Sequence, residues 1–409
     1  MYGNAETTEI KSVKDFIGFF LKELKPQGKN LFTPFNVITV PIILLGLVII
    51  VIRFAKGLGA VTNLSQEFPW GLWIGFDVLI GIALAGGAYI LCFMYYILGY
   101  EKYHPVVRVV VLNGFLAYSF YAGALILDLG RPWNAFNVLI GNKFGFSSVL
   151  FMVAWHFFLY TVSLLLEFSP AIAEWLGLKN AWKILNKMTL AAVVFGIMLS
   201  LGHQGGVGGL FLLAKAKLHP LWYSEFIPLL FVVSSVFGGL SMVIFEGSIS
   251  SKVFRHRMSE EHHETHDRIV LALAKVCAGA MFVYTFLKIM ELNHEGTWTF
   301  LATPMGYWYI LEVVGCVVLP GMLFLAGARS KGMGLVKLAA FITIIGIVLN
   351  RINICLVAYN MDAAVRYVPT WMEVVVTLTV VFTELWVYRW IVNRMPVVSD
   401  SPEWAQHAH

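Results

Sequence analysis

Long apolar runs separated by short polar connections make up the chain from residue 35 onward. A hydrocarbon layer about 30 Å thick requires about 20 apolar residues for one helical crossing. The runs lack the alternation of single residues that is typical of membrane β-barrels. We therefore predict an all-α, polytopic membrane protein with about ten transmembrane helices, at residues 35–54, 70–98, 106–127, 147–167, 186–204, 226–247, 268–291, 306–328, 334–357 and 371–393.

The segment before the first run has a different pattern. Apolar residues recur there at helical spacing, with lysines between them: Ile10, Val13, Ile17, Phe20 and Leu24. Such a pattern is typical of an amphipathic helix on an anionic membrane surface. We divide the chain into a segment 1–33 with this interfacial helix, a transmembrane domain 34–393 and a cytoplasmic tail 394–409. No basic stretch leads directly into an apolar core at the N-terminus, so a cleaved signal peptide is not expected.

Composition narrows the class of protein. Hydrophobic residues make up 59% of the 409 residues and charged residues 13%, against about 25% charged in soluble domains. This excludes a soluble enzyme, a disordered chain and a disulfide scaffold. The expected surroundings are membrane lipids, and the modest net charge of +5 gives no reason to expect a nucleic-acid partner.

The chain offers few ligands for a metal or a haem. Its four cysteines lie singly in apolar runs, so no iron–sulfur or zinc site is expected within it. A haem in the bilayer normally needs two histidines on facing helices, and only His156 and His203 lie clearly inside predicted spans. The run Glu260–Asp267 is rich in Glu and His, but its composition predicts a solvated cytoplasmic loop. We predict that this chain binds no metal, haem or iron–sulfur cluster.

The distribution of basic residues predicts the orientation. Of the 29 Lys and Arg residues, 19 lie at or near the membrane side that holds both termini, and eight lie at the other side. Basic residues favour the cytoplasmic side. Both termini are therefore predicted to be cytoplasmic in a bacterial inner membrane, and the periplasmic loops are 55–69, 128–146, 205–225, 292–305 and 358–370.

Ionisable residues gather toward the periplasmic ends of the predicted helices. Each costs a few kcal/mol inside a span, so it usually pairs, lines water or has a function. Asp128 and Arg131 are three residues apart at a helix end, which a capping ion pair would explain equally well. Lys288 and Glu291 have the same spacing, whereas Asp77 has no partner nearby in the sequence.

His203 and Asp77 are the strongest candidates for chemistry. His203 is followed by Gly205, Gly206, Gly208 and Gly209, where the backbone could approach a ligand closely. An imidazole and a buried carboxyl suit proton transfer near neutral pH. Quinone reduction needs such a pair, because two carbonyl oxygens are protonated. The same pattern would equally allow a proton-coupled transporter.

A second set of ionisable residues lies deeper and suggests a proton pathway from the cytoplasm. Its members are His156, Glu167, Glu246, Lys275, Glu312 and Glu384. Glu167 and Glu246 lie near cytoplasmic helix ends, where snorkelling or capping would also explain them. The pathway is a hypothesis from placement alone.

A series of short motifs resembles the integral membrane subunits of the polysulfide-reductase and nitrite-reductase family. The resemblance covers about Leu58 to Tyr388, and its members look most like the membrane subunits of hydrogenase-2 and of the periplasmic menaquinone reductase complex. The motifs are Phe68-Pro-Trp-Gly-Leu-Trp-Ile-Gly-Phe-Asp77, Tyr103-His-Pro105, Asp128-Leu-Gly-Arg131, Leu166-Glu-Phe168, Leu185-Asn-Lys187, His203-Gln204, His219-Pro-Leu-Trp222, Phe245-Glu-Gly247 and Pro369-Thr-Trp371.

The resemblance implies a fold and a task. It implies two four-helix bundles, at 70–204 and 226–357, with the first and tenth helices outside them. It implies a menaquinone pocket in the first bundle near the periplasmic face, and electrons arriving from an iron–sulfur, ferredoxin-like subunit docked on the periplasmic loops. A molybdopterin-type or hydrogenase subunit would complete the complex, with a multihaem cytochrome c as a further candidate partner.

Residues carry over from the family by position. The predicted quinone site contains Trp73, Asp77, Asp128, Arg131, His203, Gln204 and Glu225. Met152 stands where hydrogenase-2-like members carry a Glu, so a proton role at that position is not transferred, and His156, one turn on, is the candidate replacement. Met152 and the N-terminal extension favour the menaquinone reductase within the family.

Two other classes of function stay open. A secondary transporter would show inverted repeats and helices interrupted near the membrane midplane. A purely structural anchor for periplasmic redox subunits would have all its buried charges neutralised in pairs.

Overall fold

In a computed structural model, the described residues are 13–25, 32–137, 145, 147–255, 260–399 and 401–406. They are almost entirely helical, and within these ranges the extended structure is one isolated β-bridge between Leu218 and Tyr359. Ten helical segments are long and apolar enough to cross a membrane. The prediction of an all-α protein with ten transmembrane helices is confirmed.

Each predicted run coincides with one observed span. Single helices form seven of them: α2 (Pro34–Lys56), α6 (His104–Asp128), α8 (Val149–Trp175), α9 (Lys179–Leu210), α10 (Ile227–Val253), α11 (Glu260–His294) and α15 (Trp371–Val392). The second, eighth and ninth spans are composite. The second span consists of α3 (Leu72–Ile74), η2 (Gly75–Gly81), α4 (Ile82–Leu84), α5 (Gly87–Cys92) and η3 (Phe93–Ile97). The eighth consists of α12 (Pro304–Ile310), η9 (Leu311–Val318) and α13 (Leu319–Ser330). The ninth consists of α14 (Met333–Ile352) and η10 (Asn353–Val357).

The composite spans contain π-helical segments, and these hold polar residues. Asp77 lies in η2, Glu312 in η9 and Asn353 in η10. A π-helical turn widens the helix and is found often at functional sites. The polar residues of these three spans therefore lie where the regular helical ladder is interrupted.

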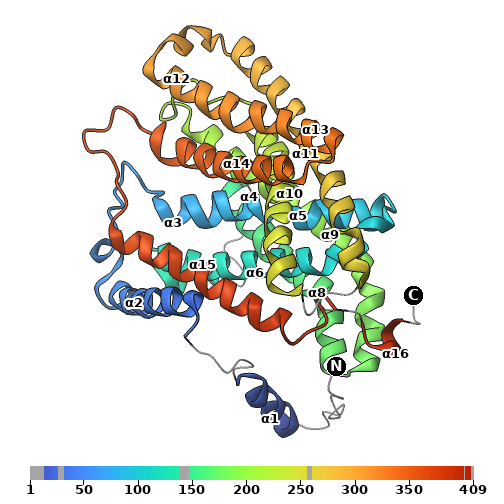
Figure 1. Cartoon of the computed structure of the whole chain (residues 1–409). Coiled ribbons are helices and arrows are strands. Elements are labelled where there is room, and N and C mark those ends of the chain that lie inside the picture. The colour runs from blue at the N-terminus through green and yellow to red at the C-terminus, as the bar shows by residue number, and fades with distance from the viewer. Residues whose placement is uncertain are drawn as a thin grey trace.

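Helix contacts connect neighbouring spans in two groups. In the first group α5 contacts α6 and α9, and α8 contacts α6 and α9. In the second, α10 contacts α11 and α14, and α13 contacts α11 and α14. Figure 1 shows α2 and α15 side by side at one edge of the molecule and α12 to α14 at the opposite edge. These contacts support two four-helix bundles, which we keep as a prediction.

Glycine pairs form the closest contact between the two groups. A Cβ atom on Gly239 would lie 2.1 Å from the backbone nitrogen of Gly87, and one on Gly86 would lie 2.8 Å from the carbonyl oxygen of Ser235. Small residues allow helix backbones to approach each other in membranes. The pairs Gly86–Gly87 and Gly238–Gly239 thus join α10 to the second span.

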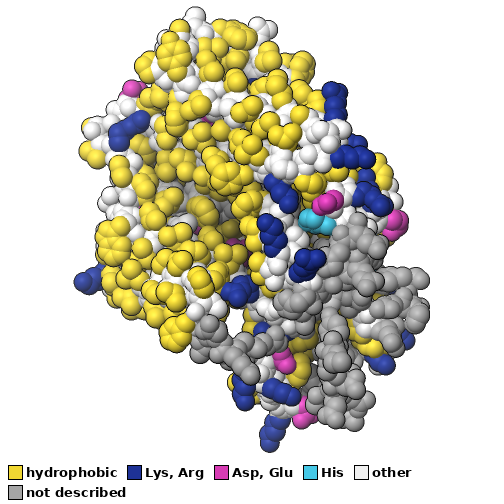
Figure 2. Space-filling view, in the orientation of Figure 1, with side chains coloured by type: hydrophobic (Ala, Val, Ile, Leu, Met, Phe, Trp, Pro, Cys, Tyr) yellow, Lys and Arg dark blue, Asp and Glu magenta, His cyan; other side chains and the backbone are white. Residues whose placement is uncertain are grey.

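The surface has the character of a lipid-facing one. In Figure 2, hydrophobic side chains cover most of the visible face, while Lys and Arg side chains gather toward the right. In Figure 1 this is the end at which α5 and α13 finish, opposite the loops that precede α3 and α15. The basic end is the one predicted to be cytoplasmic, and the orientation stays a prediction.

The N-terminal helix is docked against the end of α15. The described part is α1 (Val13–Glu23), and Ile10 lies outside the described residues. Arg394 donates from Nε to the carbonyl oxygen of Glu23 at 2.6 Å and pairs with its carboxylate at 3.2 Å. The rings of Phe20 and Trp390 pack at 5.9 Å. α1 is therefore fastened to the chain just after α15.

Two local expectations were wrong. The glycines after His203 are helical residues of α9, and Gly208 packs against α10, where a Cβ would lie 2.9 Å from the carbonyl oxygen of Ile227. Their backbone is regular helix and not a loose segment, and the approach of a ligand to these glycines stays a prediction. The segment Glu260–Asp267, predicted to be a loop, is the start of α11, because a polar helix can extend past the membrane without an apolar signal in its sequence.

Candidate functional site

His203 is a fully buried ionisable group of the first helix group. Its side chain on α9 is 0% exposed, and Nδ1 lies 3.2 Å from the carbonyl oxygen of Val153 on α8. Since a carbonyl only accepts, this contact assigns the proton to Nδ1. Nε2 is buried and has no hydrogen-bond partner in the described part of the chain. That nitrogen is available to a ligand.

Gln204 ties this part of α9 to the second span. Its side-chain nitrogen donates to the carbonyl oxygen of Ile82 at 2.9 Å, and the residue is 3% exposed. Ile82 begins α4 directly after η2, the segment that contains Asp77. The bond therefore fixes the elements that carry His203 and Asp77 against each other.

Asp77 is a buried carboxyl without a cation beside it. It is 3% exposed, and Oδ1 has no hydrogen-bond partner among the described residues. Its electrostatic neighbours are the carboxyls of Asp128 and Glu384. A buried carboxyl next to other carboxyls is expensive as an anion, which makes Asp77 a candidate for proton transfer.

The cation near Asp128 is one that the sequence did not suggest. Arg131 is exposed and forms no ion pair with Asp128 in the described chain, so the capping pair is absent. Arg53 of α2 is 3% exposed, interacts electrostatically with Asp128 and donates to the carbonyl oxygens of Leu127 and Leu129. The first span thereby caps the end of α6.

Two residues of the predicted quinone site, Trp73 and Glu225, do not present a free buried polar atom as His203 and Asp77 do. Trp73 is buried, and its indole nitrogen donates to the carbonyl oxygen of Glu373 at 3.0 Å. Its polar atom is thus used to hold α3 against α15. Glu225 is exposed just before α10.

Carboxyl groups form a row from Asp77 toward the predicted cytoplasmic end. Glu384 of α15 interacts electrostatically with Asp77 and with Glu246 of α10. Tyr121 of α6 interacts with all three carboxyls. We call Asp77, Glu384 and Glu246 the carboxyl row.

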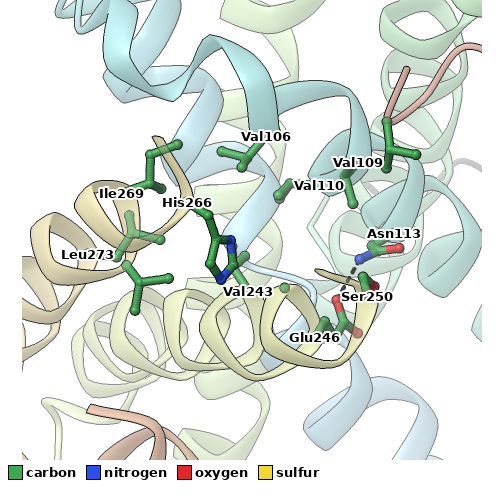
Figure 3. A pocket seen from close by; sticks show the side chains of 13 residues that line it. Val106, Val109, Val110, Asn113, Val243, Glu246, Ser250, His266, Ile269 and Leu273 are labelled. Carbon is green, nitrogen blue, oxygen red and sulfur yellow. Dashed lines mark hydrogen bonds between the residues drawn. The ribbon is translucent and has the colours of Figure 1, made fainter. Parts of the chain in front are cut away.

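A small cavity adjoins the inner end of the carboxyl row. Asn113 donates to Glu246 at 2.5 Å, as the dashed line in Figure 3 shows. The cavity has a volume of about 40 Å³ and is also lined by Ser250 and His266, which is room for water. It lies between α6, α10 and the first turns of α11. Glu246 is therefore within reach of solvent from that end.

A second line of polar groups lies inside the first helix group. The hydroxyls of Tyr118 and Tyr160 both interact with the hydroxyl of Ser200, and all three side chains are at most 1% exposed. The two tyrosine rings meet edge to face at 4.6 Å, and the ring of Tyr118 lies 5.9 Å from that of His203. At the far end the thiol of Cys92 donates to Glu167 at 3.5 Å. Hydroxyls in apolar runs carry no sequence signal, so the sequence did not predict a role for these three residues.

Two further predicted pathway residues, His156 and Lys275, lie outside the carboxyl row, and His156 interacts electrostatically with His203. His156 is partly exposed, and its imidazole packs against α9, where a Cβ on Gly202 would lie 3.1 Å from it. This leaves no haem-wide gap between His156 and α9. Lys275 is exposed on the outside of α11.

Glu312 belongs to a separate buried network in the second helix group. Its carboxylate accepts from Trp222 at 2.9 Å, from Asn350 at 2.6 Å and from Asn353 at 2.5 Å. Arg351 donates to the side-chain oxygen of Asn350 at 2.6 Å. The carboxylate of Glu312 accepts three hydrogen bonds, whereas Oδ1 of Asp77 accepts none from the described residues.

Comparison with known proteins identifies the family. The family model described as "Polysulphide reductase, NrfD" matches residues 60–363. The chain belongs to this NrfD family. The match spans the second to the ninth helices, which contain Asp77, His203 and Glu246.

Relatives cover nearly the whole NrfD-family chain. A protein from Nitratidesulfovibrio vulgaris is 43% identical over 92% of this chain and 97% of its own length. The probable Ni/Fe-hydrogenase 2 b-type cytochrome subunit of Escherichia coli is 30% identical over 91% and 95%. The integral membrane subunit of the menaquinone reductase of N. vulgaris is 26% identical over 78% and 80%. These identities do not support the expected preference for the menaquinone reductase over the hydrogenase.

The names of these relatives describe subunits of redox complexes. The chain is accordingly a membrane subunit of the kind found in quinone-linked oxidoreductases. One relative is named a b-type cytochrome, so the absence of haem stays a prediction. In the described ranges no group of three or more His, Cys, Asp or Glu residues could hold a metal ion.

Proposed function

We propose that this chain is the membrane subunit that reduces menaquinone near the periplasmic face of the bacterial inner membrane. The observation that carries the proposal is the pair of buried, unsatisfied groups, Nε2 of His203 and Oδ1 of Asp77. Apolar surroundings suit a substrate that arrives from lipid, and each quinone carbonyl needs one hydrogen-bonding acid. The menaquinone reductase relative supports this substrate.

In this proposal the protein positions the quinone and supplies protons. His203 passes a proton through Nε2 to one carbonyl oxygen as the quinone is reduced, while Nδ1 stays bonded to Val153. The Asp77 carboxyl donates to the other. Gln204 holds the two elements together through Ile82, so both acids keep their positions when the substrate leaves.

Electrons come from a partner in this proposal. An iron–sulfur, ferredoxin-like subunit docks on the predicted periplasmic loops and delivers electrons one at a time, and a hydrogenase or molybdopterin-type subunit supplies them. Relatives named for hydrogenase, menaquinone reductase and selenate reductase support such an assembly. The loops that would receive the partner are bonded together, since Asn360 donates to the carboxylate of Glu67 at 2.7 Å.

Protons enter from the cytoplasm along the carboxyl row. The cavity at Glu246, the link to Glu384 and the contact of Glu384 with Asp77 support this direction. Glu167 belongs to the separate line described above, and Glu312, Lys275 and His156 have no described contact with the row. Charge would then cross the membrane during turnover.

The deciding experiment is a titration of the purified complex with a fluorescent quinone-site inhibitor, an alkyl-hydroxyquinoline N-oxide. Saturable quenching near one inhibitor per complex is expected in the parent complex. We expect His203→Ala and Asp77→Asn to weaken binding at least about tenfold, because each removes a donor to the headgroup. Glu101→Gln, an exposed carboxyl at the other end, serves as the matched control.

The other outcomes separate the rival functions. Unchanged binding in both variants would move the pocket away from these residues. No binding in the parent complex would leave a structural anchor or a proton-coupled transporter. The anchor is disfavoured because Asp77 has no cationic partner in the described structure, whereas the interrupted second span keeps the transporter as an alternative.

The proton route makes its own prediction. In sealed vesicles that hold the complex in one orientation, Glu246→Gln should slow quinone reduction about tenfold or more, because the row loses its inner proton acceptor. Proton uptake from the cytoplasmic side, followed with a pH-sensitive dye, should fall in parallel. Voltage-insensitive reduction with protons drawn from the periplasmic side would contradict the route.

A further inference from the structure

A line of buried hydroxyls lies between α6, α8 and α9. Facing positions on α8 and α9 line up along one seam. On α8, Val153, Tyr160 and Glu167 are spaced seven residues apart, and on α9, Gly196, Ser200 and His203 share one face. Because the helices are antiparallel neighbours, the seam runs from His203 at one end to Glu167 at the other.

The packing around Gly196 shows that the inner groups are close neighbours. A Cβ atom placed there would lie 2.9 Å from Oε1 of Glu167, 3.0 Å from the hydroxyl of Ser163 and 3.3 Å from the ring of Tyr160. Tyr160 also interacts electrostatically with Glu167. The absence of a side chain at residue 196 therefore lets the Glu167 carboxyl reach into the seam.

The middle of the seam consists of unsatisfied hydroxyls. Tyr118, Tyr160 and Ser200 are buried, and none has a hydrogen bond of regular geometry with a described residue. The two tyrosines nevertheless interact with the Ser200 hydroxyl. Buried hydroxyls are normally bonded, so three unsatisfied ones in one place indicate groups that exchange partners.

We propose that Ser200, Tyr118 and Tyr160 form a hydroxyl relay that supplies His203 with protons from Glu167, separately from the carboxyl row that ends at Asp77. The inference rests on the proposed function. Each of the two acids that face the quinone then has its own supply. Neighbouring tyrosines on α6 mark the division, because Tyr118 faces the relay and Tyr121 faces the carboxyl row.

The proton balance is simple. Two electrons from the iron–sulfur partner and one proton from each acid convert the quinone to the quinol. His203 loses its Nε2 proton to one quinone oxygen. A hydroxyl of the relay then returns a proton to Nε2 and takes one from the next hydroxyl, and the last takes one from the Glu167 carboxyl. Glu167 is reprotonated from the predicted cytoplasmic end, where Tyr96 interacts with both Glu167 and Arg108, whose side chain is 31% exposed.

The length of the relay suits this task. His203 to Gly196, beside which the Glu167 carboxyl lies, spans seven residues of α9, about 10 Å at 1.5 Å per residue. This is about one third of a 30 Å hydrocarbon layer, a distance that three hydroxyls can bridge. Between the ends of the relay the described seam carries no Asp, Glu, Lys or Arg, and its other titratable side chain is His156, whose imidazole faces Gly202.

The test measures quinone reduction by the whole complex, with a reduced viologen as donor and a short-chain menaquinone analogue as acceptor. We expect Tyr160→Phe and Ser200→Ala to lower kcat about tenfold or more and to enlarge the solvent deuterium isotope effect. The KM and the affinity for the fluorescent inhibitor should stay within about twofold, because neither hydroxyl faces the headgroup. Tyr89→Phe is the matched control, since it removes a buried hydroxyl that is bonded to Ser235 at 2.9 Å and lies outside the relay.

A second pair of variants keeps the test decisive if a hydroxyl variant fails to assemble. Gly196→Ala should slow turnover in the same way, because its methyl group displaces the Glu167 carboxyl, whereas Gly209→Ala on the same helix meets its nearest neighbour at 3.8 Å and should not. If Tyr160→Phe, Ser200→Ala and Gly196→Ala all reduce quinone at the rate of the parent complex, the relay is overturned and the proposed quinone site is unaffected. A parent complex that neither binds the inhibitor nor reduces quinone would overturn both proposals.

Discussion

Individual buried charges in this protein fall into two kinds. Lys288 and Glu291 lie 2.7 Å apart and are 4% and 2% exposed, and Glu312 accepts three hydrogen bonds. Asp77 and His203 have no partner of opposite charge among the described residues, and each keeps an atom without a hydrogen bond. Burying a polar group without a partner is costly, so the second kind indicates function and the first stability.

The ion pair gives a prediction about stability. Lys288→Met should lower the free energy of unfolding by about 3 kcal/mol, because it leaves the Glu291 carboxylate buried and unpaired. The double variant Lys288→Met with Glu291→Leu should regain most of this loss, since the unpaired charge is gone. Denaturant unfolding of the detergent-solubilised protein measures both. Equal losses in the single and double variants would contradict this account.

At the scale of elements, the connections at the predicted periplasmic end hold the helices in register. The backbone nitrogen of His219 donates to the carbonyl oxygen of Ala358 at 2.9 Å. The imidazole ring of His219 packs on the rings of Trp222 and Phe300, with 5.6 Å between ring centres in each case. The backbone nitrogen of Leu221 donates to Nδ1 of His219 at 3.2 Å. The loop before α10 is thus fastened to the loop that follows η10.

This loop should be sensitive to acid. Burial lowers the pKa of His219 below its ordinary value, so the folded loop favours the neutral imidazole. The unfolded state takes up a proton near pH 6.5 before the folded one does, and the stability that His219 contributes is therefore lost as the pH falls below about 6.5. The thermal unfolding midpoint should fall less between pH 7.5 and pH 5.5 in His219→Asn, which keeps an acceptor but does not titrate. The same fall in both proteins would exclude His219 as the cause.

The whole molecule is joined by backbone contact between its two helix groups. Gly86, Gly87, Gly238 and Gly239 bring α10 against the second span. Hydrophobic burial does not drive helices together in lipid, so close packing must supply the association energy. Asp77 and the carboxyl row lie near this contact, because α10 carries Glu246 and the second span carries Asp77.

A single methyl group should disturb that contact. Gly239→Ala places its Cβ 2.1 Å from the backbone nitrogen of Gly87, and a backbone cannot move aside as a flexible side chain can. We expect a loss of at least about 2 kcal/mol and weaker inhibitor binding, measured by unfolding and by fluorescence quenching. Gly279→Ala, which meets nothing within 4 Å, is the control. Equal stability of the two variants would refute the role of the contact between Gly239 and Gly87.

Parts of the candidate site could be found in the sequence, and others could not. Asp77, His203, Glu246 and Glu384 stand out because a charge in an apolar run is visible in one dimension. Tyr118, Tyr160 and Ser200 do not, because hydroxyl residues are common in transmembrane helices. Trp73 and Arg131 belong to the motifs and Glu225 lies just after one, yet Trp73 binds the backbone of α15 and the other two are exposed.

The sequence by itself determined the ten spans and the family, because burial in lipid depends on the local composition of each segment. Only the tertiary structure decided which groups meet: Arg53 with Asp128, Glu384 with Asp77, and two tyrosines with Ser200. These residues come from different helices. Their meeting depends on how the helices are rotated and packed, and a sequence does not state that rotation when every face of a helix is apolar.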